Sequence, residues 1–322
     1  MNKELVCEKR DGFWFYSIFH YNGAALIKEA IIIDEKETKK FVSYINKKNI
    51  DKVIIDLFHS DIESLSFLKN IKHIKYLVIW GNGVIDNSPI YELTNLKFLK
   101  ILRPSELDIN RVKSLEFFST TEPGKIINIE HATSLKTLEL INTTKQGSYN
   151  DLTFLSKLYN LDTLLLSNFN ITTLEGIENL TKLKVLILED MKKLENINSL
   201  TSLSSSLRRL QIYKCNRICS FDPIKELNKL VFLSMDSVKL VPNIEFISNL
   251  KKLCSFILWE SNVINGNMTP LTFIDHALVY PIRQHYYIIK QGVKIAAKET
   301  DFKYGERNMG DEDIELWRRI SY

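Results

Sequence analysis

Apolar residues recur in a fixed pattern between about residue 50 and residue 265. Each copy opens with a leucine-type residue, the anchor, and aliphatic or aromatic residues follow it three and five places later. This spacing predicts a short strand whose large side chains face one core. Further apolar residues then follow at steps of three, as in Ile171, Leu174, Ile177 and Leu180, which favours a 3₁₀ or tight helical return. Such a unit cannot bury its core alone, so stacked copies are required.

Ten anchors can be assigned, and most of them lie 22 to 24 residues apart: Ile50, Ile74, Leu96, Val112, Leu135, Leu161, Leu183, Leu207, Leu230 and Leu253. The copy that starts at Leu96 is shortened to 16 residues, so we expect an irregular turn near Pro104–Asn110. Ten tandem copies in one register predict a solenoid.

The segments before and after the array lack the repeat. Asp11-Gly12 and Asn22-Gly23 are hairpin-turn dipeptides, and they separate the strand-like runs Leu5–Lys9, Phe13–His20 and Ala24–Ile33. Asp34 and Glu37 have capping-box spacing and precede a predicted helix over residues 35–48, with Phe41, Tyr44 and Ile45 on its apolar face. After the array, residues 286–290 and 293–297 flank Gln291-Gly292 as a predicted hairpin, and Asp313–Ile320 has a short apolar pattern. We expect both flanks to cap the array.

Composition sets the compartment and excludes some functions. The 322 residues carry a formal net charge of +4, too mild and too dispersed for a dedicated nucleic-acid binder. No run reaches the 18 or so apolar residues of a membrane span, and no signal peptide precedes the array. Four cysteines in a chain of this length do not form a disulfide scaffold. We expect a cytoplasmic protein that is a monomer by itself and does not contact membranes.

Together these features resemble the leucine-rich repeat family, and in particular its short bacterial-type repeats of about 22 residues. The polar position eight residues after the anchor is Asn82 in one copy and Cys215 in another, and it is degenerate elsewhere. The resemblance implies an α/β solenoid, a horseshoe of about ten repeats with a parallel sheet on its concave side. The expected domains are an N-terminal capping region over residues 1–49, the repeat array over residues 50–265, and a C-terminal capping region over residues 266–322.

In such a fold the first, fourth and sixth positions face the core, and the third, fifth, seventh and eighth face outward. Large apolar side chains on the outward rows need an explanation. Two aromatic clusters are predicted there, one of Tyr76, Trp80, Phe98, Leu102 and Phe118 and the other of Tyr213, Phe232 and Trp259. Exposed aromatic residues among charges are typical of protein-interface hot spots. The alternatives are that the capping regions cover some of these residues, or that they stack only on one another.

The outward rows carry more acidic than basic residues, although the whole chain is slightly basic. We count five basic residues and seven acidic ones; the acidic residues are Asp56, Glu116, Glu139, Glu189, Asp190, Asp236 and Glu260. An acidic face repels phosphate and favours a basic protein partner. The predicted partner-binding residues are therefore the two aromatic clusters together with Glu189, Asp190, Arg209, Asp236 and Glu260.

Other kinds of site have weaker support. Basic residues recur at the second position and could track a nucleic-acid backbone, although such a row is more often a solvated edge: Lys75, Lys97, Lys113, Lys136, Lys184 and Arg208. Cys215 and Cys219 could supply two metal ligands, but no histidine or second cysteine pair has zinc-site spacing, so a buried structural thiol is favoured. No catalytic motif or cofactor-binding loop is present, and we predict no catalytic, cofactor or metal residues.

These observations favour a non-enzymatic module that binds a protein partner on its concave face. By analogy with the family, the most concrete version is an immunity or inhibitor protein that neutralises a bacterial toxin domain. The toxin domain would be the partner with the basic surface. One alternative is an exported effector that binds host proteins. Two others are nucleic-acid binding through the basic rim and an enzyme that uses the C-terminal 55 residues or so.

Overall fold

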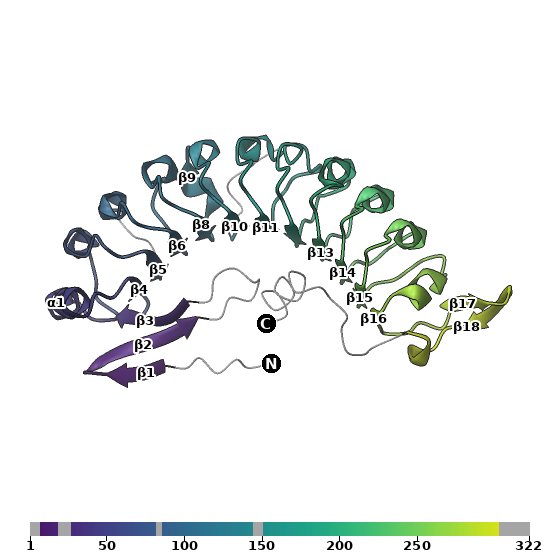
Figure 1. Cartoon of the computed structure of the whole chain (residues 1–322), viewed down its shortest axis with the longest axis horizontal. Coiled ribbons are helices and arrows are strands. Elements are labelled where there is room, and N and C mark those ends of the chain that lie inside the picture. The colour runs from purple at the N-terminus through teal and green to yellow at the C-terminus, as the bar shows by residue number, and fades with distance from the viewer. Residues whose placement is uncertain (1–6, 19–26, 82–85, 144–150, 303–322) are drawn as a thin grey trace. The chain divides into compact units, whose positions relative to one another are not determined.

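The computed structural model describes residues 7–18, 27–81, 86–143 and 151–302, and the predicted turn at Asn22-Gly23 and the segment Asp313–Ile320 lie outside these ranges. The chain forms two compact units. The first unit lies within Met1–Gln146 and the second within Gly147–Gly310. Both contain a stack of short strands with tight helical returns on one side (Figure 1).

The sheet of the first unit has the order β1-β2-β3-β4-β5-β6-β8-β10. From β3 onward every pair of neighbouring strands is parallel. A separate parallel pair is formed by β7 (Leu107–Asp108) and β9 (Ile126–Ile127). The sheet strands are β1 (Cys7–Arg10), β2 (Phe13–Ile18), β3 (Ile27–Ile33), β4 (Lys52–Asp56), β5 (Tyr76–Trp80), β6 (Phe98–Ile101), β8 (Phe117–Thr120) and β10 (Thr137–Ile141).

The N-terminal strands and helix agree with most of the sequence-based predictions. β1 and β2 pair antiparallel across Asp11 and Gly12, which both adopt positive φ, and β2 pairs antiparallel with β3. Helix α1 (Thr38–Lys48) buries Phe41 and Ile45 and ends at Asn49 in the left-handed conformation. The predicted capping box was wrong, because the N-cap is Glu37 and no side chain caps the helix. β3 also pairs parallel with β4, so it is both the last strand of the meander and the first of the parallel sheet.

The sheet of the second unit has the order β11-β12-β13-β14-β15-β16, all parallel and without register shifts. The predicted C-terminal hairpin is confirmed, since β17 and β18 pair antiparallel. The strands are β11 (Thr163–Ser167), β12 (Val185–Glu189), β13 (Arg209–Tyr213), β14 (Phe232–Asp236), β15 (Ser255–Trp259), β16 (His276–Tyr280), β17 (Tyr287–Lys290) and β18 (Val293–Ala296).

In most repeats the predicted three-residue periodicity forms a short 3₁₀ helix, whose three residues per turn place the apolar side chains in one row. The return that contains Ile171, Leu174, Ile177 and Leu180 is instead a series of turns, in which Ile177 N–H donates to the Leu174 carbonyl and Leu180 N–H to the Ile177 carbonyl. In the first unit they are η1 (Ser66–Asn70), η2 (Ser88–Glu92), η3 (Ile109–Arg111), η4 (Pro123–Lys125) and η5 (Ile129–His131). In the second unit they are η6 (Thr153–Leu155), η7 (Asn198–Leu203), η8 (Asp222–Glu226), η9 (Glu245–Asn249), η10 (Thr269–Phe273) and η11 (Glu299–Asp301).

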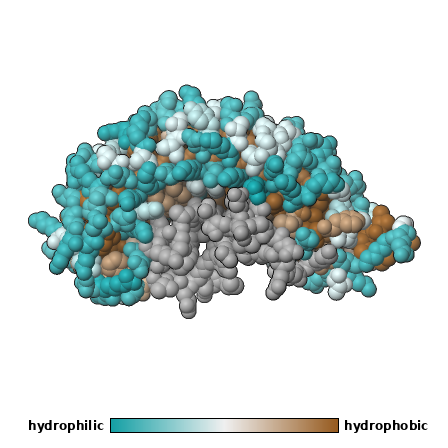
Figure 2. Space-filling model, viewed as in Figure 1, coloured by the Kyte–Doolittle hydropathy of each residue, from teal (hydrophilic) through white to brown (hydrophobic). Residues whose placement is uncertain are grey.

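The main core lies between the strands and the returns. It is built from the first, fourth and sixth positions and the apolar residues of the returns, as in Leu161, Leu164, Leu166 and Leu174, which are all buried. The opposite side of each sheet, which carries the third, fifth and seventh positions, is called the outer face below. Figure 2 shows hydrophobic residues over the β17–β18 hairpin, where Ile289, Val293 and Ile295 are exposed.

One repeat was assigned to the wrong register. The strand pairing places Phe117 opposite Phe98 and Phe118 opposite Leu99, so the anchor is Leu115 and not Val112. The repeats on either side of it then have 19 and 20 residues, and the predicted 16-residue repeat does not exist. The apolar pattern predicted the wrong register because the sixth position of this repeat is Thr120. This threonine is fully buried, but a search for apolar residues does not count it as a core residue. Phe118 is therefore a core residue, and Phe117 occupies the outer face in its place.

Candidate functional site

Parallel pairing aligns the outer face of the second unit into continuous rows. The seventh positions form one row across all six strands, called the seventh-position row: Ser167, Glu189, Tyr213, Asp236, Trp259 and Tyr280. Strands in a sheet lie about 4.8 Å apart, so neighbouring side chains in this row are within contact distance of each other. Four of the residues predicted to bind a partner lie in this row, namely Glu189, Tyr213, Asp236 and Trp259.

The eighth positions fix the row at the end of the strands. Asn168, Asp190, Lys214, Ser237 and Glu260 all adopt positive φ, between 48° and 61°. Each of their backbone N–H groups donates to the carbonyl of the seventh residue in the next repeat, at 2.7–3.0 Å. The left-handed conformation costs a non-glycine residue about 1–2 kcal/mol, and the repeated hydrogen bond offsets that cost. The predicted site residues Asp190 and Glu260 therefore have a structural role in the turn, with side chains that lie beside the row.

An exposed aromatic pair ends the row. The ring centroids of Trp259 and Tyr280 lie 4.6 Å apart with an interplanar angle of 27°. Trp259 is 38% exposed and Tyr280 is 51% exposed, although stacking covers one face of each ring. Buried aromatic residues stabilise folds, whereas a stacked pair open to solvent is the arrangement found at the centre of binding surfaces.

Carboxylates lie beside this pair. Asp236 is next to Trp259 in the row, and Glu260 follows Trp259 in the chain. Burial raises the pKa of Asp236; a hydrogen bond from Ser237 opposes this effect, the charge of Glu260 adds to it, and Lys214 opposes it. The two carboxylates are thus close enough to repel each other. Among the described residues Glu260 has no ion-pair partner, which leaves its charge available.

In the middle of the row, on the other side of Asp236 from Trp259, a cation already lies on an aromatic ring. The Lys214 ammonium lies 4.7 Å from the Tyr213 ring centroid. Its pKa is raised, first by its hydrogen bond with the Tyr213 side chain and also by the charges of Asp190 and Asp236. Lys192 forms an ion pair with Asp190 at 3.2 Å. Around Tyr213 the acidic charge is thus partly neutralised by ion pairs and a cation of the chain itself, whereas beside Trp259 Lys214 acts on Asp236 only through its charge and Glu260 has no ion pair among the described residues.

Two predicted site residues, Arg209 and Phe232, lie beneath the surface. They occupy the third positions of neighbouring strands and are buried. The guanidinium carbon of Arg209 lies 3.9 Å from the Phe232 ring centroid. The expectation that these side chains are exposed was wrong. They support the outer face as a stacked pair.

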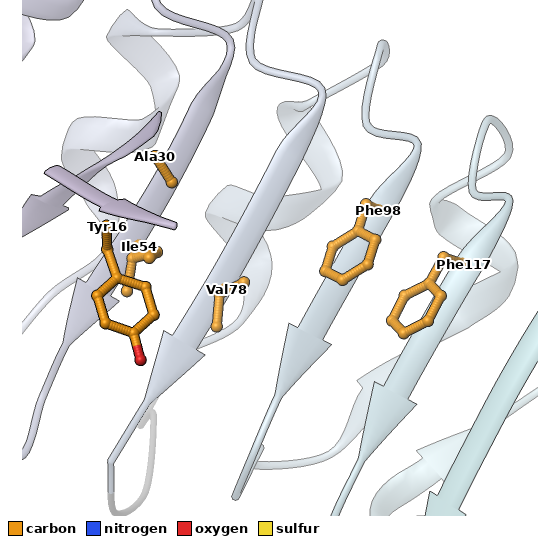
Figure 3. Packing of buried hydrophobic residues seen from close by; sticks show 6 residues of the cluster. All are labelled: Tyr16, Ala30, Ile54, Val78, Phe98 and Phe117. Carbon is orange, nitrogen blue, oxygen red and sulfur yellow. The ribbon is translucent and has the colours of Figure 1, made fainter. Parts of the chain in front are cut away.

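The predicted aromatic cluster of the first unit is largely closed. Phe98 is only 1% exposed, and its ring stacks on that of Phe117 at 3.9 Å and 5°. A second hydrophobic cluster lies here on the outer face, and Figure 3 shows its members on adjoining strands: Tyr16, Ala30, Ile54, Val78, Phe98 and Phe117. Ala30 leaves room for Tyr16 to extend over the sheet, so that its ring meets Trp80 edge-on at 5.3 Å.

The remaining members of that predicted cluster are partly buried. Tyr76 and Trp80 pack against the second hydrophobic cluster, and Leu102 is also partly buried. Phe118 is absent from the outer face because of the register described above. In the first unit, Tyr16 of strand β2 thus covers part of the outward aromatic residues, as one of the sequence-based alternatives expected.

The predicted basic rim is interrupted by acidic residues. With the corrected register Glu116, and not Lys113, occupies the second position of its repeat. Glu116 forms ion pairs with Lys97 at 2.9 Å and with Lys136 at 2.7 Å, and its pKa is lowered, chiefly by the hydrogen bond from Lys136. Lys75 lies 3.6 Å from Asp51. A phosphate backbone would have to compete with these carboxylates for the lysines.

Tyr280 was missed at the sequence level, because the repeat that contains it was assigned to the C-terminal region. The signal was present: Ile274 lies 21 residues after Leu253, and Ala277 and Val279 follow it three and five places later. The small side chain of Ala277 made the pattern look unlike a repeat, yet β16 pairs in register with β15.

The cysteines and histidines do not form a site in the described structure. Burial raises the pKa of Cys215 to about 12, and its thiol contacts the Leu188 and Tyr213 carbonyls. Cys215 is therefore a protonated structural thiol. The same position two repeats later is Ser261, whose hydroxyl donates to the Met235 and Trp259 carbonyls. Within the described ranges, no group of three or more histidine, cysteine or acidic side chains could hold a metal ion.

Searches of family models and of curated proteins find no match. Solved structures do match. An internalin of Listeria monocytogenes, InlF, is 18% identical, with a TM-score of 0.52 over 73% of this chain and 69% of that one. A leucine-rich repeat protein of Leptospira interrogans is 19% identical, with a TM-score of 0.57 over 79% of this chain and 65% of that one. At this identity the likeness concerns the fold.

Among the described residues, no helix has both the length and the apolar character needed to cross a membrane. The recurring strands and 3₁₀ returns, the parallel pairing in one register and the likeness to these solved structures lead to one assignment. The chain has the fold of a leucine-rich repeat solenoid.

Proposed function

We propose that this protein is a non-enzymatic module that binds a protein partner through the seventh-position row of its second unit. The observation that carries the proposal is the stacked pair Trp259 and Tyr280, which remains open to solvent beside the carboxylates of Asp236 and Glu260. Aromatic residues of this kind contribute a large share of the free energy of protein association. The row is also rigid, since each eighth position is hydrogen-bonded to the next repeat, and a rigid surface loses little entropy on binding.

The charge of the site favours a partner with a basic surface. The most concrete version of the proposal is an immunity or inhibitor protein that neutralises a bacterial toxin domain in the cytoplasm of the cell that makes both. This version rests on analogy with other leucine-rich repeat proteins and on the acidic, aromatic character of the row.

The protein-binding proposal is tested by isolating partners with the full chain and comparing three variants. Trp259→Ala and Tyr280→Ala should each weaken the complex by at least tenfold, about 1.4 kcal/mol or more. Trp14→Ala is the matched control, because Trp14 is also an exposed tryptophan, 41% accessible, but lies on β2. If Trp14→Ala weakens the complex and Trp259→Ala does not, the binding surface has been assigned to the wrong unit.

The immunity version has its own test. The chain is co-expressed with the product of the adjacent gene, and both complex formation and rescue of growth are measured. A stoichiometric complex that suppresses the toxicity of that product supports the version. A neighbour that is harmless, or that forms no complex, overturns it and leaves the protein-binding proposal in place.

A further inference from the structure

We propose that the indole of Trp259 and the carboxylates of Asp236 and Glu260 form a receptor for an arginine side chain of the partner. The proposal rests on the function proposed above and goes further, because it names the chemical group that the site recognises. The occupant is a basic polypeptide segment that presents a guanidinium.

The first argument is the order of residues in the row. Tyr280 on β16 stacks against one face of the Trp259 indole. The other face of the ring is turned towards β14, where Asp236 occupies the same row. A planar cation that lies on this face would therefore contact the ring and reach the Asp236 carboxylate at the same time.

The second argument is charge. Asp236 and Glu260 repel each other, and Glu260 has no ion-pair partner among the residues the structure describes. A guanidinium has five N–H donors in a fixed plane and can bridge two carboxylates, whereas an ammonium is a compact point charge. Carbohydrate and other neutral ligands could also stack on the aromatic pair, but they would leave this repulsion in place.

The third argument is that the same chain already forms contacts of this kind with its own cations. The guanidinium carbon of Arg111 lies 3.8 Å from the Tyr91 ring centroid, and Arg209 makes the corresponding contact with Phe232. Within the row, Lys214 lies on Tyr213. At the Trp259 end the described residues supply the aromatic ring and the carboxylates but place no cation on the ring, and a partner would bring that component.

The pH dependence follows from the neighbours of Asp236. Its pKa is raised by burial and by Glu260, against the opposing effects of Ser237 and Lys214. A bound guanidinium favours the ionised carboxylate and would lower this pKa. Affinity should therefore be highest above the raised pKa of Asp236 and should fall as the pH drops through it.

The experiment uses the full chain and three synthetic peptides of one length, in which glycine alternates with arginine, lysine or the neutral analogue citrulline. Binding is measured by calorimetry at neutral pH. The arginine peptide should bind at least fivefold more tightly than the lysine peptide, and the citrulline peptide should bind least. Trp259→Ala and Glu260→Gln should each remove most of this preference, and Trp14→Ala should leave it unchanged.

Equal binding of the arginine and lysine peptides would overturn the arginine receptor, and so would binding of the citrulline peptide at the same strength or no binding of any peptide. The result is distinguishable from a failure of the proposed function. If Trp259→Ala weakens the complex with a protein partner while Glu260→Gln has no effect on it, the row is a binding surface and the arginine receptor is wrong.

Discussion

The outer faces of the two units both carry stacked aromatic residues, at third positions in the first unit and at seventh positions in the second, and the two pairs have different environments. In the first unit Phe98 and Phe117 stack within a buried cluster that Tyr16 helps to close. In the second unit Trp259 and Tyr280 stack on each other and remain exposed. The difference shows that an aromatic side chain on an outward row is open to a partner only where no other part of the fold covers it.

Position along the strand accounts for part of the contrast. Third-position and fifth-position side chains lie over the middle of the sheet, and those of the first unit, such as Val78 and Phe98, are buried. Seventh-position side chains lie at the end of the strand beside the left-handed turn, which keeps Trp259 at an edge. The third-position pair of the second unit, Arg209 and Phe232, is buried as well, so both units bury large third-position side chains.

The most direct test of this difference between the two faces is to remove one aromatic residue from each. Phe98→Ala should reduce the free energy of unfolding by about 3–5 kcal/mol, because it deletes a fully buried ring from a cluster. Trp259→Ala should cost less than about 1 kcal/mol, since its side chain is exposed. Urea denaturation of the two variants measures both values. A larger loss for Trp259→Ala would reverse the roles given to the two faces.

A second substitution tests whether Tyr16 closes the first face. Tyr16→Ala should cost about 2 kcal/mol and should expose the Trp80 indole, whose edge-on contact with Tyr16 would be lost. The measurement is acrylamide quenching of tryptophan fluorescence. Trp14→Phe and Trp259→Phe are introduced both in the protein that retains Tyr16 and in the Tyr16→Ala variant, so that fewer other indoles contribute. Unchanged quenching would mean that Tyr16 does not protect this face.

A third, smaller effect concerns the only acidic side chain among the described residues that is fully buried on the outer face, Glu139. It follows Lys100 and Ser119 in the fifth-position row. Burial raises the pKa of Glu139, against opposing effects of Lys100 and Ser119. Its folded pKa lies above the unfolded one, so its contribution to stability is fully present below the unfolded pKa and is lost as the pH rises through the folded pKa.

Glu139→Gln should therefore change the pH dependence of unfolding. The glutamine does not ionise, so the variant should gain stability relative to the wild type as the pH is raised from about 4 to 8. Urea denaturation at a series of pH values checks this expectation. If the variant instead loses relative stability as the pH rises, the attraction to Lys100 outweighs the cost of burial.

The smallest expected effect is at the edge of the first unit. Glu116→Gln removes two ion pairs of a half-exposed carboxylate and should cost less than about 1 kcal/mol. Hydrogen bonds from lysine lower the pKa of Glu116, so its contribution is present above the unfolded pKa and is lost as the pH falls through the folded one. High salt should reduce the difference between variant and wild type. A difference that is independent of salt would point to packing as its cause.

Much of the fold could be predicted because it depends on local spacing. The strands that follow Ile50, Ile74, Leu96 and Leu161 pair in the predicted register, and the hairpin turns at Asp11-Gly12 and Gln291-Gly292 form. The errors occurred where one residue of unusual type interrupts the pattern. Because Thr120 occupies a core position, the register of its repeat was predicted wrongly. Because Ala277 is small, the repeat that ends in Tyr280 was not recognised.

The sequence alone determined the repeat, because aliphatic residues at fixed spacing can be buried together only in stacked strands and returns. It also determined which residues occupy the outward rows in most repeats. Only the tertiary structure decided which of those residues are covered, because burial on that face depends on contacts between segments far apart in the chain. Tyr16 meets Trp80, 64 positions later, while Trp259 meets Tyr280 one repeat away and remains open.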